Sequence, residues 1–281
     1  MSPVPADALP VVLLPVGVDE AVLDAGLAAL EAGTPAGTRV WLADDAQSGP
    51  RGRALIERWL GRTRLKADYT RRPAPLGEVA HLDEMLAACA GLDVVVLAPD
   101  AQPLPGWLVQ LAGCLASDAS IATATPWCNA GETAGWPRLG EVDQPPADRQ
   151  RTAQACAAMP ATYPELPAAV SHAVALRGRA RVRAGGLDQH SYRSGYAALI
   201  DLSLRLSGLG WRNVLCQSAF VARAGEGGPA EGDLDALAAR WPDWNARLAR
   251  FLMEDPLQQA RARLQACHAE LVMEPQRALF G

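Results

Sequence analysis

The chain has 281 residues, of which 49% are hydrophobic and 20% charged, and its formal net charge is −5 at pH 7. This size and composition indicate a globular protein with a substantial core, in one large domain or two small ones. The negative net charge argues against a broad phosphate-binding surface, so we expect no nucleic-acid partner.

The cysteines and the apolar segments limit where the protein works. None of the six cysteines has a CxxC partner, which disfavours a zinc site and favours a reducing compartment. No segment has the length of a membrane span, and the apolar stretch at 11–18 is too short for a signal core with a cleavage site. We therefore expect a cytoplasmic protein, which partners can bring to the inner membrane.

The first part of the chain alternates apolar runs with amphipathic stretches. Segments typical of strands occur at 11–15, 39–43, 67–71, 94–97 and 121–125, and the unbroken apolar runs at 11–15 and 94–97 fit strands buried in a parallel sheet. Between them, apolar residues recur at helical spacing, at 21–30, 55–60, 79–89 and from 105 onward. This alternation predicts an α/β fold with a doubly wound, mostly parallel sheet flanked by helices.

The second part is less regular. A Gly- and Pro-rich loop is expected at 127–146, followed by a helix at 149–159, a strand at 170–176, a helix at 195–209, short strands at 211–216 and 218–222, a Gly-rich link at 224–232 and a helical tail. We expect one α/β domain over 1–230, with halves at 11–125 and 126–230. The extension at 231–281 is expected to pack on it through apolar stripes.

The stretch VVVLAPDAQPLPGWL at 94–108 places a carboxylate at the end of a buried strand. Pro99 stops ladder pairing, and Asp100 follows it directly. Ligands of open α/β sheets bind outside the carboxyl ends of the strands. Asp100 is therefore placed to hold a metal or a sugar, and a turn or helix-cap role is the alternative.

Six sequence blocks follow one another in a characteristic order. They are VVLLPV (11–16), WLADDAQSG (41–49), PLGEVAHLDEML (75–86), LAPDAQPLPGWL (97–108), TPWCNAGETAGWP (125–137) and GLDQHSYRSGYAALIDLSLRLSGLGWRNVL (186–215). In this order they resemble the inverting family 2 glycosyltransferases, and most of all the bacterial rhamnosyltransferase-like branch. The resemblance implies the GT-A fold, with a C-terminal helical tail.

The resemblance also implies a nucleotide site. Pro15, Val16 and Asp44 correspond to its nucleotide-binding positions, and Asp44 would accept a hydrogen bond from the base. A helix cap is the alternative for Asp44. Asp83 stands where the family often has Asn, and a solvated helix position is the alternative there.

The expected metal site departs from the family pattern. The family's DxD motif reads Ala98-Pro99-Asp100, so only the last carboxylate remains to hold Mg²⁺ or Mn²⁺ in an active protein. Mg²⁺ can be held by one or two carboxylates together with phosphates and water. The family's His after the last strand is Arg223 here, which binds no metal but can neutralise phosphate.

The expected catalytic base departs further. The family's GYGEExD motif reads GYAALID, so Ala198 and Leu199 replace both glutamates and Asp201 is the remaining catalytic candidate. An i,i+4 ion pair with Arg205 is the alternative for Asp201. Loss of a general base typically slows a reaction by about 10²–10⁴-fold.

Two functional hypotheses follow from the resemblance. The first is a transferase that moves a sugar from a UDP-, dTDP- or GDP-sugar to a glycan or lipid-linked acceptor in bacterial surface polysaccharide synthesis. On its acceptor side the resemblance points to Asn129, and His190 is the histidine best placed to replace the base. The second is a degenerate GT-A domain that serves as the binding or scaffold partner of an active transferase.

Overall fold

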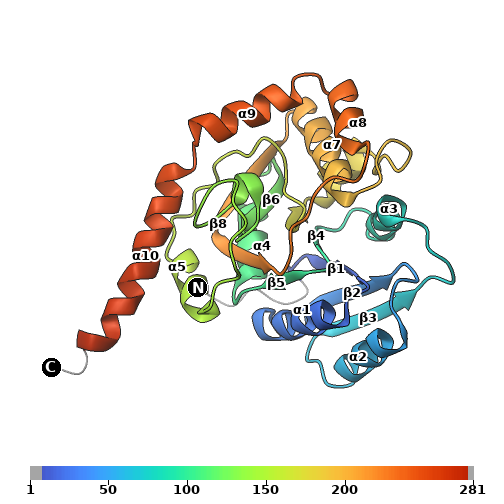
Figure 1. Ribbon diagram of the computed structural model, residues 1–281, viewed down its shortest axis with the longest axis horizontal. Helices are drawn as coiled ribbons and strands as arrows, with labels where there is room; N and C mark the ends of the chain where they lie inside the picture. The colour runs from blue at the N-terminus through green and yellow to red at the C-terminus, as the bar shows by residue number, and fades with distance from the viewer. Residues whose placement is uncertain (1–7, 278–281) are drawn as a thin grey trace.

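The computed structural model describes residues 8–277, with side chains through residue 271. Within this range one eight-stranded sheet forms the centre of the molecule, in the order β3-β2-β1-β4-β7-β6-β8-β5 (Figure 1). The strands are β1 (Val11–Pro15), β2 (Arg39–Asp44), β3 (Lys66–Arg71), β4 (Val94–Leu97), β5 (Ala101–Pro103), β6 (Ile121–Trp127), β7 (Ala173–Leu176) and β8 (Arg212–Arg223).

The expected parallel sheet is confirmed in the first part of the chain. β1 pairs in parallel with β2 and β4, and β2 pairs in parallel with β3. β7 then lies between β4 and β6 and is antiparallel to both. The sheet is therefore mixed, and a strand from the second part of the chain joins the two halves.

Three elements differ from the sequence prediction. The two short strands expected at 211–216 and 218–222 are one strand, β8, which is interrupted by a register shift against β6 between Pro126 and Trp127. β5 was not predicted, because it has only three residues and contains two polar or proline positions. The short helix at 178–184 was missed because its charged residues hide any apolar stripe.

Helices cover both faces of the sheet. They are α1 (Glu20–Gly33), α2 (Pro50–Leu60), α3 (Glu78–Ala88), α4 (Trp107–Ser117), the 3₁₀ turn η2 (Glu132–Ala134), α5 (Arg149–Ala157), α6 (Gly178–Ala184), α7 (Gly195–Gly208), α8 (Asp233–Arg240), α9 (Trp244–Glu254) and α10 (Gln258–Arg277). In β1, Val12 packs in the cluster that includes α1, α2 and α4, whereas Leu13 packs in the cluster that includes α3 and α7. Alternate side chains of a strand point to opposite faces, so both faces carry a core.

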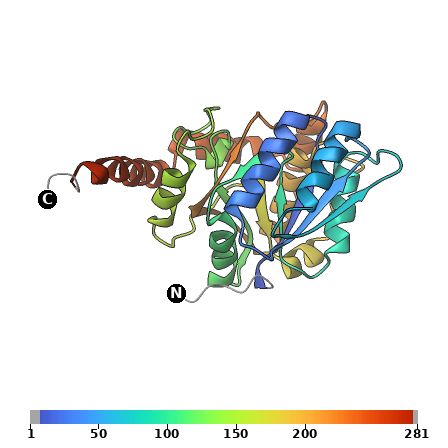
Figure 2. The same ribbon diagram turned by 90° about the horizontal axis from the view of Figure 1, so that it is seen from below.

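Part of the described tail packs on the body through apolar side chains, whereas Leu252 is exposed. Leu237 and Trp244 join the core beneath α7, while Leu257 and Leu264 pack with Trp127 in a third cluster beside α5. α10 lies along α5 and then extends away from the body (Figures 1 and 2). Among the described residues, no helix combines the length and the apolar character that crossing a bilayer requires.

Candidate functional site

A cavity of about 310 Å³ opens at the carboxyl ends of β1 and β4, and we call it the edge cavity. Such an edge is where open α/β sheets bind their ligands. The side chains that matter chemically in its lining are those of Pro15, Glu78, Tyr196, Leu199 and Arg223. They come from four parts of the chain that the sheet brings together.

Asp100 and Arg223 form a buried ion pair beside this cavity. Arg223 donates from Nε to Oδ2 of Asp100 at 3.0 Å and from Nη2 to Oδ1 at 2.8 Å. The backbone N–H of Gly225 donates to the same Oδ2 at 2.9 Å. Both carboxylate oxygens of the expected metal ligand are therefore bonded within the protein.

Asn129 fixes the backbone of Arg223. Its side-chain amide donates to the Arg223 carbonyl at 3.1 Å, and its Oδ1 accepts from the Arg223 N–H at 2.9 Å. The same amide donates to the carbonyl of Asp143, in the loop that follows β6. Asn129, predicted for the acceptor side, thus holds the end of β8 in place.

Glu78 is a charged residue of the edge cavity that sequence reasoning missed. It opens α3, and its Oε1 accepts from the backbone N–H of Gly195 at 2.8 Å, at the start of α7. The residue is solvent-exposed overall, but burial of its carboxyl raises the pKa of Glu78, and the charge of Asp233 raises it further. Positions 195 and 199 lie on one face of a helix, so this carboxylate sits one turn from Leu199.

Tyr196 and Glu132 form a second polar pair at this edge. The Tyr196 hydroxyl donates to Glu132 Oε1 at 2.7 Å. Glu132 has a left-handed backbone with φ of 43°, which is uncommon for a residue with a side chain and recurs at functional sites. Burial raises the pKa of Glu132 and also that of the Tyr196 phenol.

Asp201, the sequence candidate for the catalytic base, lies outside the edge cavity. It is fully buried and accepts from Arg205 Nε at 2.8 Å, which is the ion pair named as its alternative role. Trp241 Nε1 donates to its other oxygen at 2.9 Å, and Arg240 pairs with that oxygen at 3.2 Å. A sealed carboxylate with these partners joins α7 to α8, and an acceptor hydroxyl cannot reach it.

The two positions at which the sequence resemblance would place glutamates belong to the core. Ala198 is completely buried and Leu199 is 2% exposed, both within the cluster between the sheet and α7. Leu199 also borders the edge cavity. The cavity wall is apolar at the point where the family pattern would place a carboxylate.

Asp44 is the last residue of β2, and its carboxylate is hydrogen-bonded by nearby residues. It is fully buried and accepts from the backbone N–H groups of Gln47 and Ser48, from the Ser48 hydroxyl and from the Tyr69 hydroxyl. Burial alone would raise the pKa of Asp44, but the hydrogen bonds from Ser48, Tyr69 and Gln47 lower it below its usual value. The bonds to positions 47 and 48 hold the turn after β2 and cap no helix, because α2 begins at Pro50 with Gly49 as its N-cap.

Asp45 connects β2 to the edge cavity. Its carboxylate accepts from the backbone N–H groups of Leu76 and Gly77 at 2.7 and 2.8 Å. Gly77 has φ of +100°, a conformation that glycine adopts without strain, and it directly precedes α3. Asp45 therefore sets where α3 begins and where Glu78 lies.

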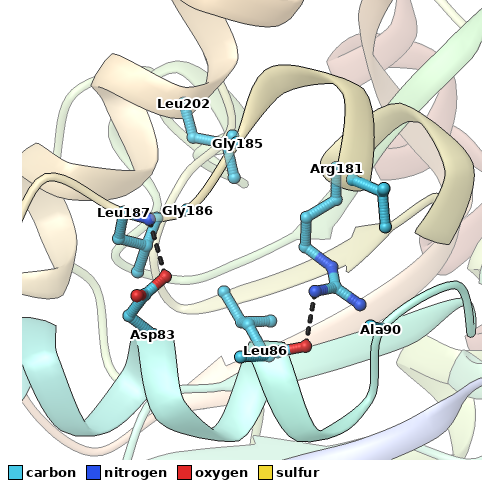
Figure 3. Close-up of a pocket in the computed structure, with 10 residues that line it drawn as sticks. Asp83, Leu86, Ala90, Arg181, Gly185, Gly186, Leu187 and Leu202 are labelled. Carbon is cyan, nitrogen blue, oxygen red and sulfur yellow. Dashed lines mark hydrogen bonds between the residues drawn. The ribbon is translucent and has the colours of Figure 1, made fainter.

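Asp83 lies in a different pocket, on the side of α3 that faces α6 and α7. Figure 3 shows its carboxylate accepting from the backbone N–H of Leu187, at 2.7 Å. A side chain in place of Gly186 would press against that carboxylate. On the far wall of this pocket, Arg181 donates to the Leu86 carbonyl and thereby caps α3. The structure thus places Asp83 in a contact between α3 and the loop before α7.

The remaining predicted site residues are dispersed. Pro15 lines the edge cavity, and Val16 is buried just beyond β1 with its N–H bonded to the Ala43 carbonyl. His190 is exposed in the loop before α7, where its backbone N–H bonds Asp188. The structure therefore gathers Pro15, Asp100 and Asn129 around the end of β8, but not Asp44, Asp83, Asp201 or His190.

A sequence signal existed for Glu78. In a βα unit of a parallel sheet, the N-terminus of the helix lies at the same edge as the carboxyl end of the strand. A glutamate directly after Gly77, at the start of a predicted helix, is therefore a candidate for that edge. No such signal existed for Glu132, whose position depends on the path of a loop.

Comparison with known proteins identifies the fold. No protein-family model and no curated protein matches the sequence. Among solved structures, GalNAc-T7 with UDP, GalNAc and Mn²⁺ is similar with a TM-score of 0.61 and 12% identity. That match covers 92% of this chain and 54% of the other, so this chain spans about half of that neighbour's length.

A mannosyltransferase, PcManGT from Pyrobaculum calidifontis in complex with GDP-Man and Mn²⁺, is similar over 94% of this chain and 87% of its own. The TM-score for this pair is 0.54, and the identity is 14%. At such identities the likeness describes the fold alone. The chain therefore has the GT-A glycosyltransferase fold, a mixed sheet flanked by helices.

Proposed function

We propose that the chain is a glycosyltransferase that binds a nucleotide-diphosphate sugar in the edge cavity and transfers the sugar to a glycan or lipid-linked acceptor. The observation that carries the proposal is the cavity itself, at the ligand-binding edge of a GT-A sheet, with an arginine and a glutamate in its lining. Bacterial surface polysaccharide as the product rests on the six sequence blocks that resemble the rhamnosyltransferase-like branch.

We propose Glu78 as the catalytic base in place of the missing glutamates of α7. Its carboxylate lines the cavity, and among the described residues only Oε1 has a hydrogen-bond donor, the N–H of Gly195. A raised pKa makes a carboxylate a better base near neutral pH. Glu78 would take the proton of the acceptor hydroxyl as the acceptor oxygen bonds the anomeric carbon and the bond from that carbon to the diphosphate breaks.

The test is nucleotide-sugar binding and turnover in the Glu78→Gln variant. The amide oxygen of Gln can still accept from Gly195, so α7 keeps its N-terminal bond. We expect release of nucleoside diphosphate to fall by about 10²–10⁴-fold while UDP-, dTDP- or GDP-sugar binding by calorimetry is retained. Glu57→Gln, at an exposed position of α2, is the matched control. Equal turnover in the Glu78→Gln variant and the wild type would reject Glu78 as the base.

A degenerate domain that partners an active transferase is the second candidate function. The observation that favours it is the apolar pair Ala198 and Leu199, both buried where the family pattern has acids. This hypothesis predicts nucleotide-sugar binding without release of nucleoside diphosphate, in the wild type and in the Glu78→Gln variant alike. Addition of an active transferase would then be needed to observe any product.

A further inference from the structure

The pair of Asp100 and Arg223 is built as a fixed unit rather than a surface contact. The side chains are 17% and 8% exposed, and the two parallel hydrogen bonds match the planar fork of guanidinium to the carboxylate. Ala101 pairs with Arg223 across β5 and β8, and Asn129 holds the Arg223 backbone through two bonds. These contacts fix the backbone that carries Arg223.

The residues present do not fit the divalent ion that the sequence resemblance implies. Among the described residues, no group of three or more His, Cys, Asp or Glu side chains could hold a metal. The one expected ligand, Asp100, has both oxygens bonded by Arg223 and Gly225. A cation at Asp100 would have to displace a guanidinium and remain beside its positive charge.

Arg223 keeps one amino group for a ligand. Its Nε and Nη2 bond Asp100, whereas Nη1 has no acceptor among the described residues, and the residue lines the edge cavity. The Gly-rich turn that includes Gly227 and Gly228 lies beside this group, and their backbone N–H groups bond no carbonyl in the described part of the chain. A buried arginine with free backbone donors beside it suits a phosphate oxygen.

We propose, on the basis of the function proposed above, that Arg223 takes the place of the divalent ion and binds the diphosphate of the ligand directly, without metal. Asp100 orients the guanidinium and neutralises part of its charge. The donors offered to the ligand are Nη1 of Arg223 and the N–H groups of Gly227 and Gly228. Binding is then independent of Mn²⁺ and Mg²⁺.

The first probe is inorganic pyrophosphate, titrated by calorimetry into the full chain in EDTA. We expect binding that weakens by about tenfold or more in Arg223→Met, because a hydrogen bond to a charged group is lost. Arg183→Met, at an exposed position of α6, should bind like the wild type. Absence of pyrophosphate binding to the wild type, or equal binding to Arg223→Met, would overturn the proposal.

Two further variants guard against misfolding of Arg223→Met. Asp100→Asn combined with Arg223→Met removes both charges together and so leaves no unpaired carboxylate. Gly227→Ala keeps every charge, but its Cβ would clash with the Arg223 guanidinium and displace it. Both variants should weaken pyrophosphate binding, and a folded variant of either kind with wild-type binding would contradict the assignment.

Mn²⁺ and nucleotides complete the test. Electron paramagnetic resonance should show Mn²⁺ remaining free in the presence of the wild-type protein; retained Mn²⁺ that is lost in Asp100→Asn would overturn the proposal. UDP, dTDP and GDP are titrated in EDTA beside pyrophosphate. If pyrophosphate binds through Arg223 but none of the nucleotides binds more tightly, the anion site stands and the proposed function fails.

Discussion

Asp100 and Asp201 each pair with an arginine, yet they lie in regions of opposite accessibility. The pair of Asp100 and Arg223 borders the edge cavity, and one amino group of its arginine is free of partners among the described residues. Asp201 is sealed between α7 and α8, where Trp241 covers it and two arginines share its charge. Similar ion pairs therefore serve different ends, because only one of them can meet a ligand.

The comparison shows that the role of each aspartate depends on whether a ligand can reach its ion pair, since both aspartates have an arginine as partner. The sequence leaves two roles open for each residue, a catalytic or metal-binding one implied by the resemblance and a local one, the ion pair with Arg205 for Asp201 and a turn or cap for Asp100. In the structure, Asp201 links α7 to α8, whereas Asp100 orients the guanidinium of Arg223, which lines the edge cavity. Three predictions test this contrast: two losses of stability, the larger first, and then a dependence of stability on pH.

The Asp201→Asn variant should destabilise the fold most. It removes a fully buried carboxylate from Arg205, which is 16% exposed, and from Trp241, and breaking a buried pair costs about 3–5 kcal/mol. Urea unfolding measures the loss, with the exposed Asp235→Asn of α8 as the control. A loss below about 1 kcal/mol, the size expected of a surface pair, would show that Asp201 is not the sealed anchor described here.

The Asp100→Asn variant should cost less, about 1.5–3 kcal/mol, because it removes charge-assisted hydrogen bonds at a site open to the cavity. The freed guanidinium can turn toward water in the cavity. Adding Arg223→Met to this variant should restore part of the stability, since no unpaired buried charge remains. Equal losses for Asp100→Asn and Asp201→Asn in the same urea series would erase the proposed contrast.

The pH dependence of the free energy of unfolding should reveal the influence of the Asp100 and Arg223 pair on His172. The ring is fully buried, its Nε2 lies 3.1 Å from the Pro126 carbonyl, and burial together with the charge of Arg223 lowers the pKa of His172 to about 3. Between an unfolded pKa near 6.5 and this value, only the unfolded chain binds the proton. The contribution of His172 to the free energy of unfolding is therefore fully present above the unfolded pKa. It falls by about 1.4 kcal/mol per pH unit as the pH drops from that value toward the folded pKa.

Urea unfolding from pH 7 to pH 4 measures this slope. The His172→Gln variant, whose amide can still donate to the Pro126 carbonyl, should show a shallower slope than the wild type. In Arg223→Met the slope should level off at a higher pH than in the wild type, because loss of the Arg223 charge raises the folded pKa of His172. Identical slopes in the wild type and His172→Gln would mean that His172 accepts a proton in the folded protein. The influence of Arg223 on this region would then be smaller than the structure indicates.

Periodic sequence signals predicted most of the fold. Unbroken apolar runs such as that of β4 and the stripes of α1, α3 and α7 have one arrangement that buries them, a sheet covered on both faces. β5 was not predicted because a strand of three residues is too short to show a periodic pattern of apolar residues. β7 was expected as a strand, but its antiparallel direction depends on the path of the chain around it.

The candidate site was less predictable because it depends on which side chains pair with each other in the folded chain. The spacing of Asp201 and Arg205 predicted their ion pair, since one helical turn separates them. Asp100 and Arg223 are 123 positions apart, and no local pattern indicates that they meet. Likewise, nothing in the sequence around Asp83 shows that its carboxylate accepts from the Leu187 N–H instead of facing the edge cavity.

A crystal structure of the full chain grown with UDP in EDTA tests the central claim most directly. The account predicts a diphosphate in the edge cavity, within hydrogen-bond distance of Arg223 Nη1 and the N–H groups of Gly227 and Gly228, with the bonds from Arg223 to Asp100 intact. The contradicting result is a diphosphate that enters only when Mn²⁺ is supplied, with the ion bound to Asp100 and the Arg223 side chain displaced from it.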